Sequence, residues 1–534
     1  MMRGASIAAA LAAILAAAPA QGRDRHVSIA PYIELDQVLT ADVQNGDVLT
    51  YSNVAAGVDA TIQTRRAQVQ ISYEYQHQFA WRKGDSDQTV HSGLARAAVE
   101  VAPGFSVEGG AIATRARADI RGDAPAVLTG DNRNISQVYS VYAGPSLATH
   151  AGPVSVTASY RYGYTKANSP NGTGVTPGSP QLDAFDDEKT QVATASVGVK
   201  SGTVLPVGAT ASVGWERDDA GQLDQRYHGK FARGDVVVPV TRTVALTGGA
   251  GYEKITVSQK DPKLDGTGQP VVDGNGHFQT DPASPRRIAY NTDGLIWDAG
   301  VVWRPSPRIT VEARVGKRYG STSYTGSLSY AASKTVGLQI GVYDGIETFG
   351  SQLQSGIAAL PTSFIDQRDM FGQQFSGCVY GTSGTATGGC MNSVFQSIAS
   401  ASYRARGVDA VLSATRGPLT MGVGAGYANR RFFAPDDGTG FTVNGLTDES
   451  YYAQFYVSRQ LDRNSGISGN LFADWYKSQI PGSTDIYSIG GTGSYYHNFG
   501  RLSTTASVGL YDFRADGGDS QVQAQGMLGA RYTF

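Results

Sequence analysis

Apolar and polar residues alternate along much of the chain, and the pattern is most regular in its last segment, residues 521–534. Successive side chains of a β-strand point to opposite faces, so this alternation predicts a strand with one apolar and one largely polar face. The apolar positions are Val522, Ala524, Gly526, Leu528, Ala530, Tyr532 and Phe534. The interleaved positions are Gln521, Gln523, Gln525, Met527, Gly529, Arg531 and Thr533. The apolar face ends on two aromatic residues, which is typical of a strand that meets lipid at a membrane interface.

The same alternation recurs upstream, at residues 67–79, 154–164, 309–316, 336–342 and 502–510. No segment of comparable length has the 3.6-residue apolar repeat of an amphipathic helix. After the N-terminus, no apolar run approaches the roughly 20 residues that a membrane helix needs. The pattern therefore predicts an all-β chain.

Long and short connections between these segments alternate. The long ones lie near residues 119–134, 166–188, 260–289, 350–393 and 433–450, and follow odd-numbered strands. The short ones, such as residues 102–104 and 304–307, follow even-numbered strands and consist of turn-forming residues. This parity predicts a single antiparallel transmembrane β-barrel of about 22 strands, within a range of roughly 18 to 24, with short periplasmic turns and long extracellular loops.

Two points of this fold prediction leave alternatives. A soluble β-propeller or solenoid would need repeats of similar length, and the uneven connections argue against one. The segment 397–415 is compatible with one long strand or with a hairpin broken at Gly407.

The N-terminus has the features of a secretory signal peptide. Arg3 gives a positive start, residues 7–18 form a short apolar core, and Ala18-Pro19-Ala20 is a small-x-small cleavage site. We expect residues 1–20 to be cleaved and residues 21–534 to form the barrel. The strand pattern begins near Val27, so we expect no N-terminal plug domain of the kind that gated siderophore receptors use. The final strand should close the barrel by pairing with residues 27–39.

Composition supports a membrane barrel over a nucleic-acid-binding protein. The 534 residues carry a net charge of −2, which gives no basic surface for nucleic acid. Only 17% of the residues are charged while 10% are aromatic, which suits strands with aromatic belts. We therefore expect the protein to lie in the outer membrane, in contact with its lipid.

Two cysteines, Cys378 and Cys390, enclose a stretch rich in glycine, serine and threonine. An exported chain meets an oxidising compartment, so we expect a disulfide that closes this loop. A metal site is the weaker alternative, because no histidine lies nearby.

The search for catalytic motifs gives no candidate. The seven histidines do not stand at metal-ligand spacing, and neither a Gly-x-Ser-x-Gly nor a His-Glu-x-x-His motif occurs. We expect no enzyme and no cofactor. An outer-membrane enzyme acting on lipid remains an alternative, because such enzymes gather residues from several strands.

Three groups of residues have less specific interpretations. Asp261, Asp265, Asp273 and Asn275 could hold calcium, although such residues are also common in solvated turns. Alternate glycines in residues 422–427 predict small residues on an inner face where a loop or side chains crowd in. The charged residues of the polar faces predict either a selective lumen lining or a salt-bridge network without a transport role. These residues include Glu74, Arg161, Glu312 and Arg314.

The signal peptide, the alternating strands and the ending Ala530-Arg531-Tyr532-Thr533-Phe534 together resemble a Gram-negative outer-membrane β-barrel. In that class the terminal aromatic strand is similar to the recognition signal for the barrel-assembly machinery. The resemblance implies that this machinery is a partner and that Tyr532 and Phe534 carry the signal.

A narrower resemblance involves residues 319–330 (YGSTSYTGSLSY), followed by Lys334-Thr335-Val336, together with residues 401–430. These are similar to an outer-membrane protein family associated with exopolysaccharide and exosortase (PEP-CTERM) gene systems. The family offers no catalytic residues.

The leading functional hypothesis is a pore or export channel, for an envelope polymer such as exopolysaccharide or for small solutes. The alternatives are a structural or surface-interaction barrel that displays residues 350–393 to a partner, and the lipid-acting enzyme.

We expect deletion of Phe534 to impair assembly in the outer membrane, because it removes the terminal aromatic residue of the expected assembly signal. Export across the inner membrane should remain intact, since the signal peptide is unchanged. Signal-peptide processing and the amount of folded protein in the outer-membrane fraction measure the two steps. Normal outer-membrane levels of the variant would contradict the assignment.

Overall fold

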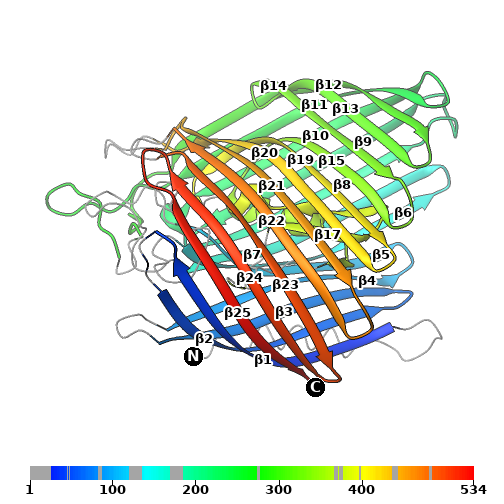
Figure 1. Ribbon diagram of the computed structural model, residues 1–534. Helices are drawn as coiled ribbons and strands as arrows, with labels where there is room; N and C mark the ends of the chain where they lie inside the picture. Colours follow the sequence, from blue (N-terminus) through cyan, green and yellow to red (C-terminus); the bar gives the residue numbers. More distant parts are fainter. Residues whose placement is uncertain are drawn as a thin grey trace.

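The chain forms a 22-stranded antiparallel sheet that closes in a ring (Figure 1). The ring closes because β1 (His26–Asp42) pairs with β2 on one side and with β25 (Gln521–Thr533) on the other. The computed structural model describes residues 26–44, 46, 48–81, 87–118, 135–168, 185–273, 277–365, 371, 377–395, 398–435, 443–479 and 484–534. The expected strand number and the predicted pairing of the last strand with the first are both confirmed.

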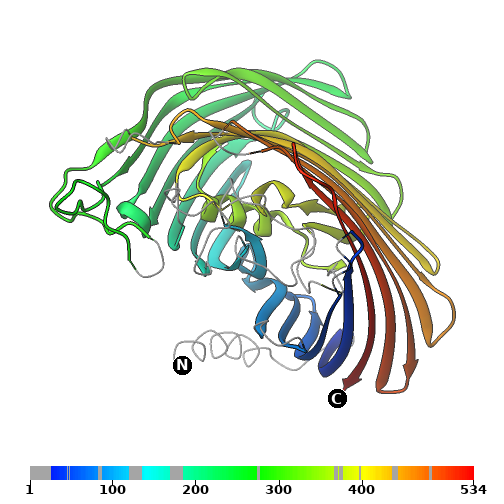
Figure 2. The same cartoon turned by 60° about the vertical axis from the view of Figure 1, so that its left-hand side comes forward.

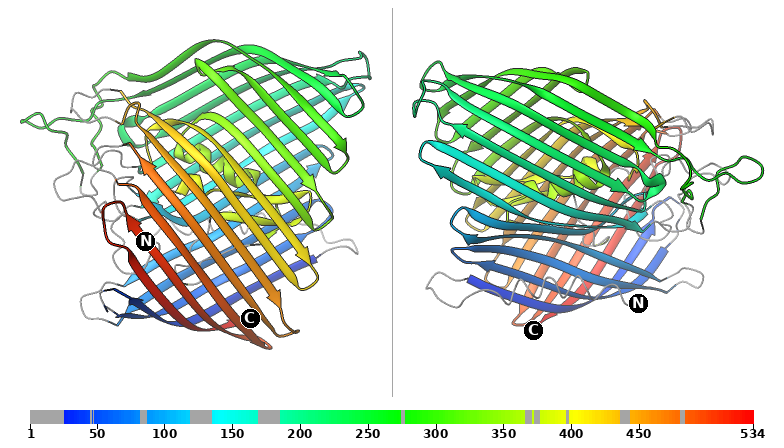
Figure 3. Two further views of the ribbon diagram at one scale, coloured as in Figure 1. Left: turned by 45° about the horizontal axis from the view of Figure 1, so that its top comes forward. Right: turned by 180° about the vertical axis from the view of Figure 1, so that it is seen from behind.

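Each wall strand pairs with its neighbour in the chain, except that β15 pairs with β19. The remaining wall strands are β2 (Val48–Gln63), β3 (Ala67–Ala80), β4 (Gln88–Ala102), β5 (Phe105–Arg117), β6 (Ile135–Ala151), β7 (Val154–Asn168), β8 (Asp187–Val199), β9 (Gly208–Ala220), β10 (Arg226–Pro239), β11 (Val244–Gln259), β12 (Arg287–Ser306), β13 (Ile309–Arg318), β14 (Ser321–Ala331), β15 (Val336–Glu347), β19 (Ser402–Arg416), β20 (Leu419–Phe433), β21 (Thr447–Gln460), β22 (Ser465–Ser478), β23 (Ile486–Phe499) and β24 (Leu502–Ala515). A short 3₁₀ turn, η1 (Gln222–Asp224), joins β9 to β10. The strands cross the wall obliquely (Figure 3), and β19 is one strand that contains Gly407.

The alternation of side chains separates an apolar outer face from a polar inner face. On β3, Tyr73 and Tyr75 are exposed while Glu74 and Gln76 between them are buried. On β25, Leu528 is 68% exposed while its neighbour Met527 is buried. Successive side chains of a strand point to opposite faces. Because the apolar residues face outward, the polar residues between them face the inside of the ring.

Connection length differs between the two ends of the ring. Residues 103–104, 152–153, 417–418 and 500–501 are tight turns at the end where β1 begins and β25 ends. A glycine with positive φ lies in each of these turns, where other residues would be strained. Residues 260–286, 348–401 and 434–446 are long connections at the opposite end.

Several expected features lie outside the described residues. They include the predicted signal peptide (residues 1–20), the loop at 119–134 and most of the loop at 166–188. Within the described part of the chain, no helix is both long and apolar enough to cross a membrane.

The prediction that residues 350–393 form a loop displayed at the surface is wrong. This stretch contains α2 (Phe349–Ala359), β16 (Phe364–Ile365), β17 (Cys378–Ser383), β18 (Ala386–Cys390) and α3 (Asn392–Phe395). These elements lie inside the ring (Figure 2). The physical reason is apolar content: Phe349, Leu353 and Ile357 are fully buried, and a solvated loop would leave them in water.

A charged cluster joins the two strands that close the ring. The Arg531 guanidinium lies 2.7 Å from a carboxylate oxygen of Glu34 and 3.8 Å from one of Glu74. It also stacks over the ring of Tyr32, 3.9 Å from the centroid. Both carboxylates are buried, so Arg531 is the cation that compensates their charge across the seam.

We expect Arg531→Gln to destabilise the folded barrel by about 3–5 kcal/mol, because it leaves buried carboxylates without their cation. The midpoint of unfolding in urea measures the loss. Folded and unfolded protein are distinguished by their different mobilities on a gel, with heat-unfolded protein as the reference. Arg501→Gln, an exposed arginine in the neighbouring turn, is the matched control. Equal midpoints for the two variants would show that the cluster does not stabilise the seam.

Candidate functional site

The candidate site is the inner segment, defined as the described residues between 348 and 401 (348–365, 371, 377–395 and 398–401), together with the wall that it contacts inside the ring. Its α2 packs against β5, β6, β7 and β8, while β17 and β18 pack against β19, and β18 also contacts β15 and β20. Its α3 contacts β20 and β21 and also reaches β5. The segment therefore bridges wall strands that lie far apart in the sheet order (Figure 2).

A buried carboxylate anchors the N-terminus of α2. The first N–H groups of a helix have no partner within the helix, and a negative charge is favourable there. Glu188 of β8 accepts a hydrogen bond from the Gly350 amide at 3.0 Å and another from the Thr348 hydroxyl. Thr348 also forms a capping box with Ser351. Asp218 of β9 lies 3.2 Å from the same hydroxyl, so two wall strands converge on the start of the segment.

The apolar side of α2 packs on the wall. Phe349, Leu353 and Ile357 belong to one buried cluster with Leu94, Ile112, Val138 and Tyr142 of β4, β5 and β6. Complete burial of a side chain of this size stabilises the packed state by about 1.5–3 kcal/mol. Apolar packing on the wall thus supplies much of the stabilisation that holds the helix in place.

Polar side chains of the wall form hydrogen bonds with backbone groups at and after the end of α2. Arg96 of β4 donates to the carbonyl oxygens of Leu360 at 3.2 Å and Ala358 at 3.0 Å. A cation is favourable at this end of a helix, where carbonyl groups lack partners. Gln70 of β3 then bonds both backbone groups of Phe364, donating to its carbonyl at 2.7 Å and accepting from its amide at 2.9 Å.

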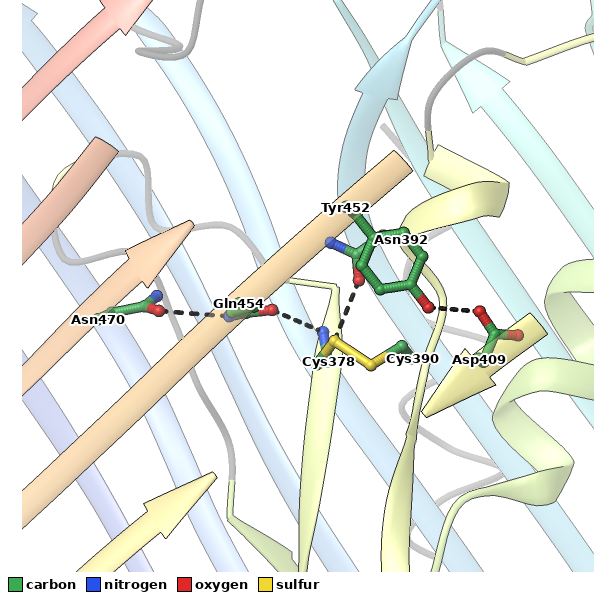
Figure 4. Close-up of a disulfide and its surroundings, with 7 residues drawn as sticks. All are labelled: Cys378, Cys390, Asn392, Asp409, Tyr452, Gln454 and Asn470. Carbon is green, nitrogen blue, oxygen red and sulfur yellow. Dashed lines mark hydrogen bonds between the residues drawn. A yellow bond between two sulfur atoms is a disulfide. The ribbon is translucent and has the colours of Figure 1, made fainter. Parts of the chain in front are cut away.

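Cys378 and Cys390 face each other in the hairpin of β17 and β18, and their sulfur atoms are bonded at 2.11 Å. The Cys378 amide donates to the side-chain oxygen of Gln454 on β21 at 3.2 Å (Figure 4). Figure 4 also shows Tyr452 of the same wall strand bonded to Asp409 of β19 beside the hairpin. The disulfide therefore lies against the wall rather than in a surface loop.

Glycines on the inner face of the wall make room for the inner segment. A Cβ atom at Gly424 would lie 2.4 Å from the sulfur of Cys378, and one at Gly422 would lie 2.5 Å from the ring of Tyr380. Gly163 faces Gln354 of α2 in the same way. The prediction that small residues in 422–427 lie where a loop crowds in is confirmed, and the loop is the inner segment.

The four charged residues predicted to line the polar faces do not form one group. Glu312 and Arg314 belong to a network with Arg233, Asp235 and Asp298 on β10, β12 and β13. The guanidinium of Arg161 instead lies 5.0 Å from the ring centroid of Tyr142, and Glu74 belongs to the seam cluster. Ion pairs therefore join charged residues of β10, β12 and β13, and the role of these charges in transport stays a prediction.

The acidic loop between β11 and β12 uses its carboxylates for local contacts. Asp265 accepts hydrogen bonds from the Thr267 hydroxyl and from backbone amides, which hold its pKa below the usual value. Asp261 pairs with Arg287, and Asp273 lies 3.6 Å from His277. The part of the loop that is described shows no group of three metal-ligating residues, and Asn275 lies outside it.

The placement of the inner segment inside the ring is the feature that the sequence did not predict. A signal was present, because Phe349, Leu353, Ile357 and Leu360 recur at the spacing of one helix face. The run is short and lies between polar stretches, so its helical repeat is a weaker signal than the strand pattern on either side of it.

No protein-family model and no curated protein matches the chain. Solved structures that it resembles include the FrpB iron transporter from Neisseria meningitidis (F5-1 variant), with 10% identity over 95% of this chain and 82% of that one and a TM-score of 0.44. The ferric-catecholate import receptor Fiu from E. coli K12, in its open form, has 10% identity over 96% of this chain and 82% of its own, with a TM-score of 0.44. The copper transporter OprC has 12% identity over 96% and 82%, with a TM-score of 0.41. Similarity at this level carries no inference about a ligand, and the resemblance to the exopolysaccharide-associated family finds no support in it.

We expect Gly424→Val to loosen the hairpin from the wall while leaving the ring closed, because the new side chain would overlap the disulfide. Overpacking of this kind costs about 1–3 kcal/mol, so the Cys378–Cys390 bond should be reduced on the order of tenfold faster in the folded protein. Gly526→Val is the matched control, since a Cβ there meets no atom within 4 Å. The rate of thiol labelling under a mild reductant measures the effect. Equal rates for the two variants would show that Gly424 does not hold the hairpin.

Proposed function

We propose that this protein is an outer-membrane transport barrel for small solutes, whose lumen is closed at rest by the inner segment. The observation that carries the proposal is the position of residues 348–401 across a closed ring of strands.

The outer face supports placement in the membrane. Large apolar side chains are exposed on strands all around the ring, among them Ile33, Leu246, Leu295, Leu471 and Leu528. Soluble monomers rarely expose contiguous apolar patches larger than a few hundred Å². Lipid covers such a face, and the closed ring leaves no strand edge with unpaired backbone groups in the hydrocarbon. With the signal peptide expected at the N-terminus, the protein resides in the outer membrane.

The inner segment is built to rest in the lumen rather than to form part of the wall. Besides its apolar packing, the inner segment is held by hydrogen bonds with wall side chains: Gln70 and Arg96 donate to its carbonyl groups, and Glu188 and Gln454 accept from its amides. Water can replace these bonds at modest net cost, because an exchanged hydrogen bond contributes only about 0.5–1.5 kcal/mol. None of these contacts belongs to the strand pairing of the wall, so a rearrangement of the segment opens a path without unpairing the wall.

The tethering of the inner segment supports small solutes over a polymer. The segment continues directly from β15 and into β19, and its hairpin carries the disulfide. Both of its ends are held at the same end of the ring, where Glu347 pairs with Tyr403, so the segment remains at that entrance when it moves and an extended polymer would have to pass it. For this reason we do not propose export of an envelope polymer.

A sealed structural barrel is the second candidate. The packing of the inner segment on β4–β8, β15 and β19–β21 favours it, because packing this extensive could be permanent. Display of residues 350–393 to a partner is not proposed again, since α2, β16, β17, β18 and α3 of this stretch lie inside the ring. Nor do we propose an enzyme, because the buried carboxylates and arginines described above hold structural elements together.

We expect the intact protein to conduct ions weakly in planar bilayers, and a variant lacking residues 349–400 to conduct at least roughly tenfold more, since a 22-stranded ring encloses an aqueous lumen when no plug fills it. The deletion is geometrically feasible because Glu347 pairs with Tyr403, so a short glycine-serine turn can join β15 to β19. Single-channel recording at neutral pH measures both.

Two outcomes would contradict the proposal. Sealed membranes with a folded deletion variant would favour the structural barrel. High, permanent conductance of the intact protein would show that the inner segment does not close the lumen. Gly424→Val provides a second test that keeps the whole chain, and its conductance should lie between the two.

A further inference from the structure

Two carboxyl side chains of the wall meet at one hydroxyl group, where the inner segment begins. Glu188 of β8 accepts hydrogen bonds from the Thr348 hydroxyl and from the Gly350 amide. Asp218 of β9 approaches the same hydroxyl, with its Oδ2 atom 3.2 Å from the Thr348 oxygen. Glu188 is the second residue of β8, and Asp218 lies two residues before the end of β9. The pair therefore stands at the end of the ring that has the long connections.

Both carboxyl groups are removed from water, since Glu188 and Asp218 are each only 1% exposed. Neither forms an ion pair with a described residue. In the part of the chain that the structure describes, no group of three side chains is arranged to hold a metal ion. A buried charge without a compensating cation is strongly destabilising. Two ionised carboxylates at this place would therefore be unfavourable.

The strongest interactions of Asp218 with its described neighbours involve no cation. These neighbours are hydroxyl and carboxyl groups on β8, on β9 and before α2, and one phenol on β10: Thr190, Glu188, Glu216, Thr348 and Tyr227. Arg161 of β7, Arg318 of β13 and Glu347 of β15 interact with Glu216. Arg318 is also bonded to Glu253 of β11, 2.5 Å away. The two arginines are thus engaged by other groups.

Both threonine hydroxyls at this site donate to Glu188. A hydroxyl group has one hydrogen to donate. That of Thr348 points to Glu188, its closest partner, and that of Thr190 lies 3.3 Å from the same carboxyl oxygen. Asp218 therefore bonds to the Thr348 oxygen only if it supplies the hydrogen itself. Its other oxygen, Oδ1, is buried and has no donor among the described residues, which costs less for the carbonyl of an acid than for a carboxylate.

We propose that Asp218 holds a proton at rest, and that this carboxylic acid latches the inner segment to the wall until the proton is lost. In the latched state Asp218 donates to Thr348, Thr348 donates to Glu188, and ionised Glu188 binds the N-terminus of α2, where a negative charge is favourable. On release, the O–H bond of Asp218 breaks and its proton passes to water in the lumen. The new carboxylate repels Glu188 and has no donor, so the start of α2 moves away from the wall.

The protonated form is the latched form, so a rise in pH favours release. Once the segment is displaced, Asp218 meets water, where an aspartic acid has a pKa of about 3.9 and is ionised at neutral pH. Release therefore sheds one proton, and its equilibrium constant increases by up to about tenfold per pH unit. This dependence ends at the pH where Asp218 ionises with the segment still in place. The inference rests on the proposed function only in taking the segment as the closure of the lumen.

Hydrogen–deuterium exchange of the α2 amides in the folded barrel measures release without any need for transport. Asp218→Asn is the decisive variant, because its amide donates to Thr348 as the acid does but does not ionise. Between about pH 5 and about pH 9, α2 of the unaltered protein should exchange faster than α2 of this variant, by a ratio that grows up to roughly tenfold per pH unit. The intrinsic pH dependence of exchange cancels in this ratio. Asp219→Asn is the matched control, since Asp219 pairs with Arg217 and Arg226 and points to the opposite face of the strand.

Infrared spectroscopy detects the proton itself, because the carbonyl stretch of a carboxylic acid is separate from the stretches of a carboxylate. At neutral pH the folded protein should show a carboxylic-acid band that Asp218→Asn lacks and Asp219→Asn retains. The gel mobility of folded protein confirms that each variant forms the barrel.

Three results would overturn the proposal. One is an identical carboxylic-acid band in the unaltered protein and in Asp218→Asn. Another is exchange of α2 whose pH dependence is the same in both proteins, which would assign release to a different group such as Glu216 or Glu347. The third is a ratio that does not change with pH. Release of α2 at high pH without a rise in conductance would support the latch and contradict the proposed closure of the lumen.

Discussion

The pairing of β1 with β25 is the constraint on which the rest of the structure depends. An open sheet of this width would leave two edges of unpaired N–H and C=O groups, and neither lipid nor a neighbouring strand would satisfy them. The pairing runs in register from Tyr32 with Thr533 to Asp42 with Gln523, so the chain ends are joined along most of one strand. The Arg531 cluster adds a charged contact at the same seam and selects one register over its neighbours, because a shift by one residue would turn Arg531 to the apolar face.

Closure of so many strands creates a second requirement, because the ring is wider than the side chains of its wall can fill. The inner segment occupies this space, and the wall is adapted to it in sequence as well as in shape. Gly163, Gly422 and Gly424 stand where a larger side chain would collide with the segment. Gln70, Arg96 and Glu188 supply hydrogen bonds that its backbone needs at its turns and helix ends. Wall and segment are consequently complementary in shape and in hydrogen bonding, although the two differ in secondary structure.

Much of the wall could be predicted from the sequence, because a strand with two different faces leaves a period of two residues. The strands at residues 67–79 and 154–164 were found for this reason, as was the closing strand. The inner segment was not found, because strands β16 to β18 are short, and α2 shows its periodicity over only three turns. The small residues of 422–427 indicated that something crowded the wall there. The segment that packs against these residues lies far from them in the sequence. A single sequence does not show which distant residues are in contact, so this segment could not be identified.

The outer face of the wall shows that a single strand does not predict which side chains meet across the sheet. Each strand from β20 to β23 contributes one aromatic residue, and no one strand reveals that the rings stack. Only the register of the sheet brings Tyr451, Trp475 and Tyr487 into a row, with Arg514 at its end. The register of strand pairing therefore determines which side chains are neighbours both in the lumen and on the outer surface. The turns and the pairing of β1 with β25 together determine this register.

The central claim is that the inner segment occupies the lumen, and a cross-link tests it most directly. Cysteines introduced at Gln354 and Gly163 should cross-link in the assembled barrel, because Gln354 fills the space beside the Gly163 backbone. Cysteines at Gln354 and Tyr162 should not, since Tyr162 is exposed on the outer face of the same strand. A cross-link for the first pair alone is the predicted result. No cross-link for the first pair, in protein that folds and labels at both positions, would contradict the placement of the inner segment.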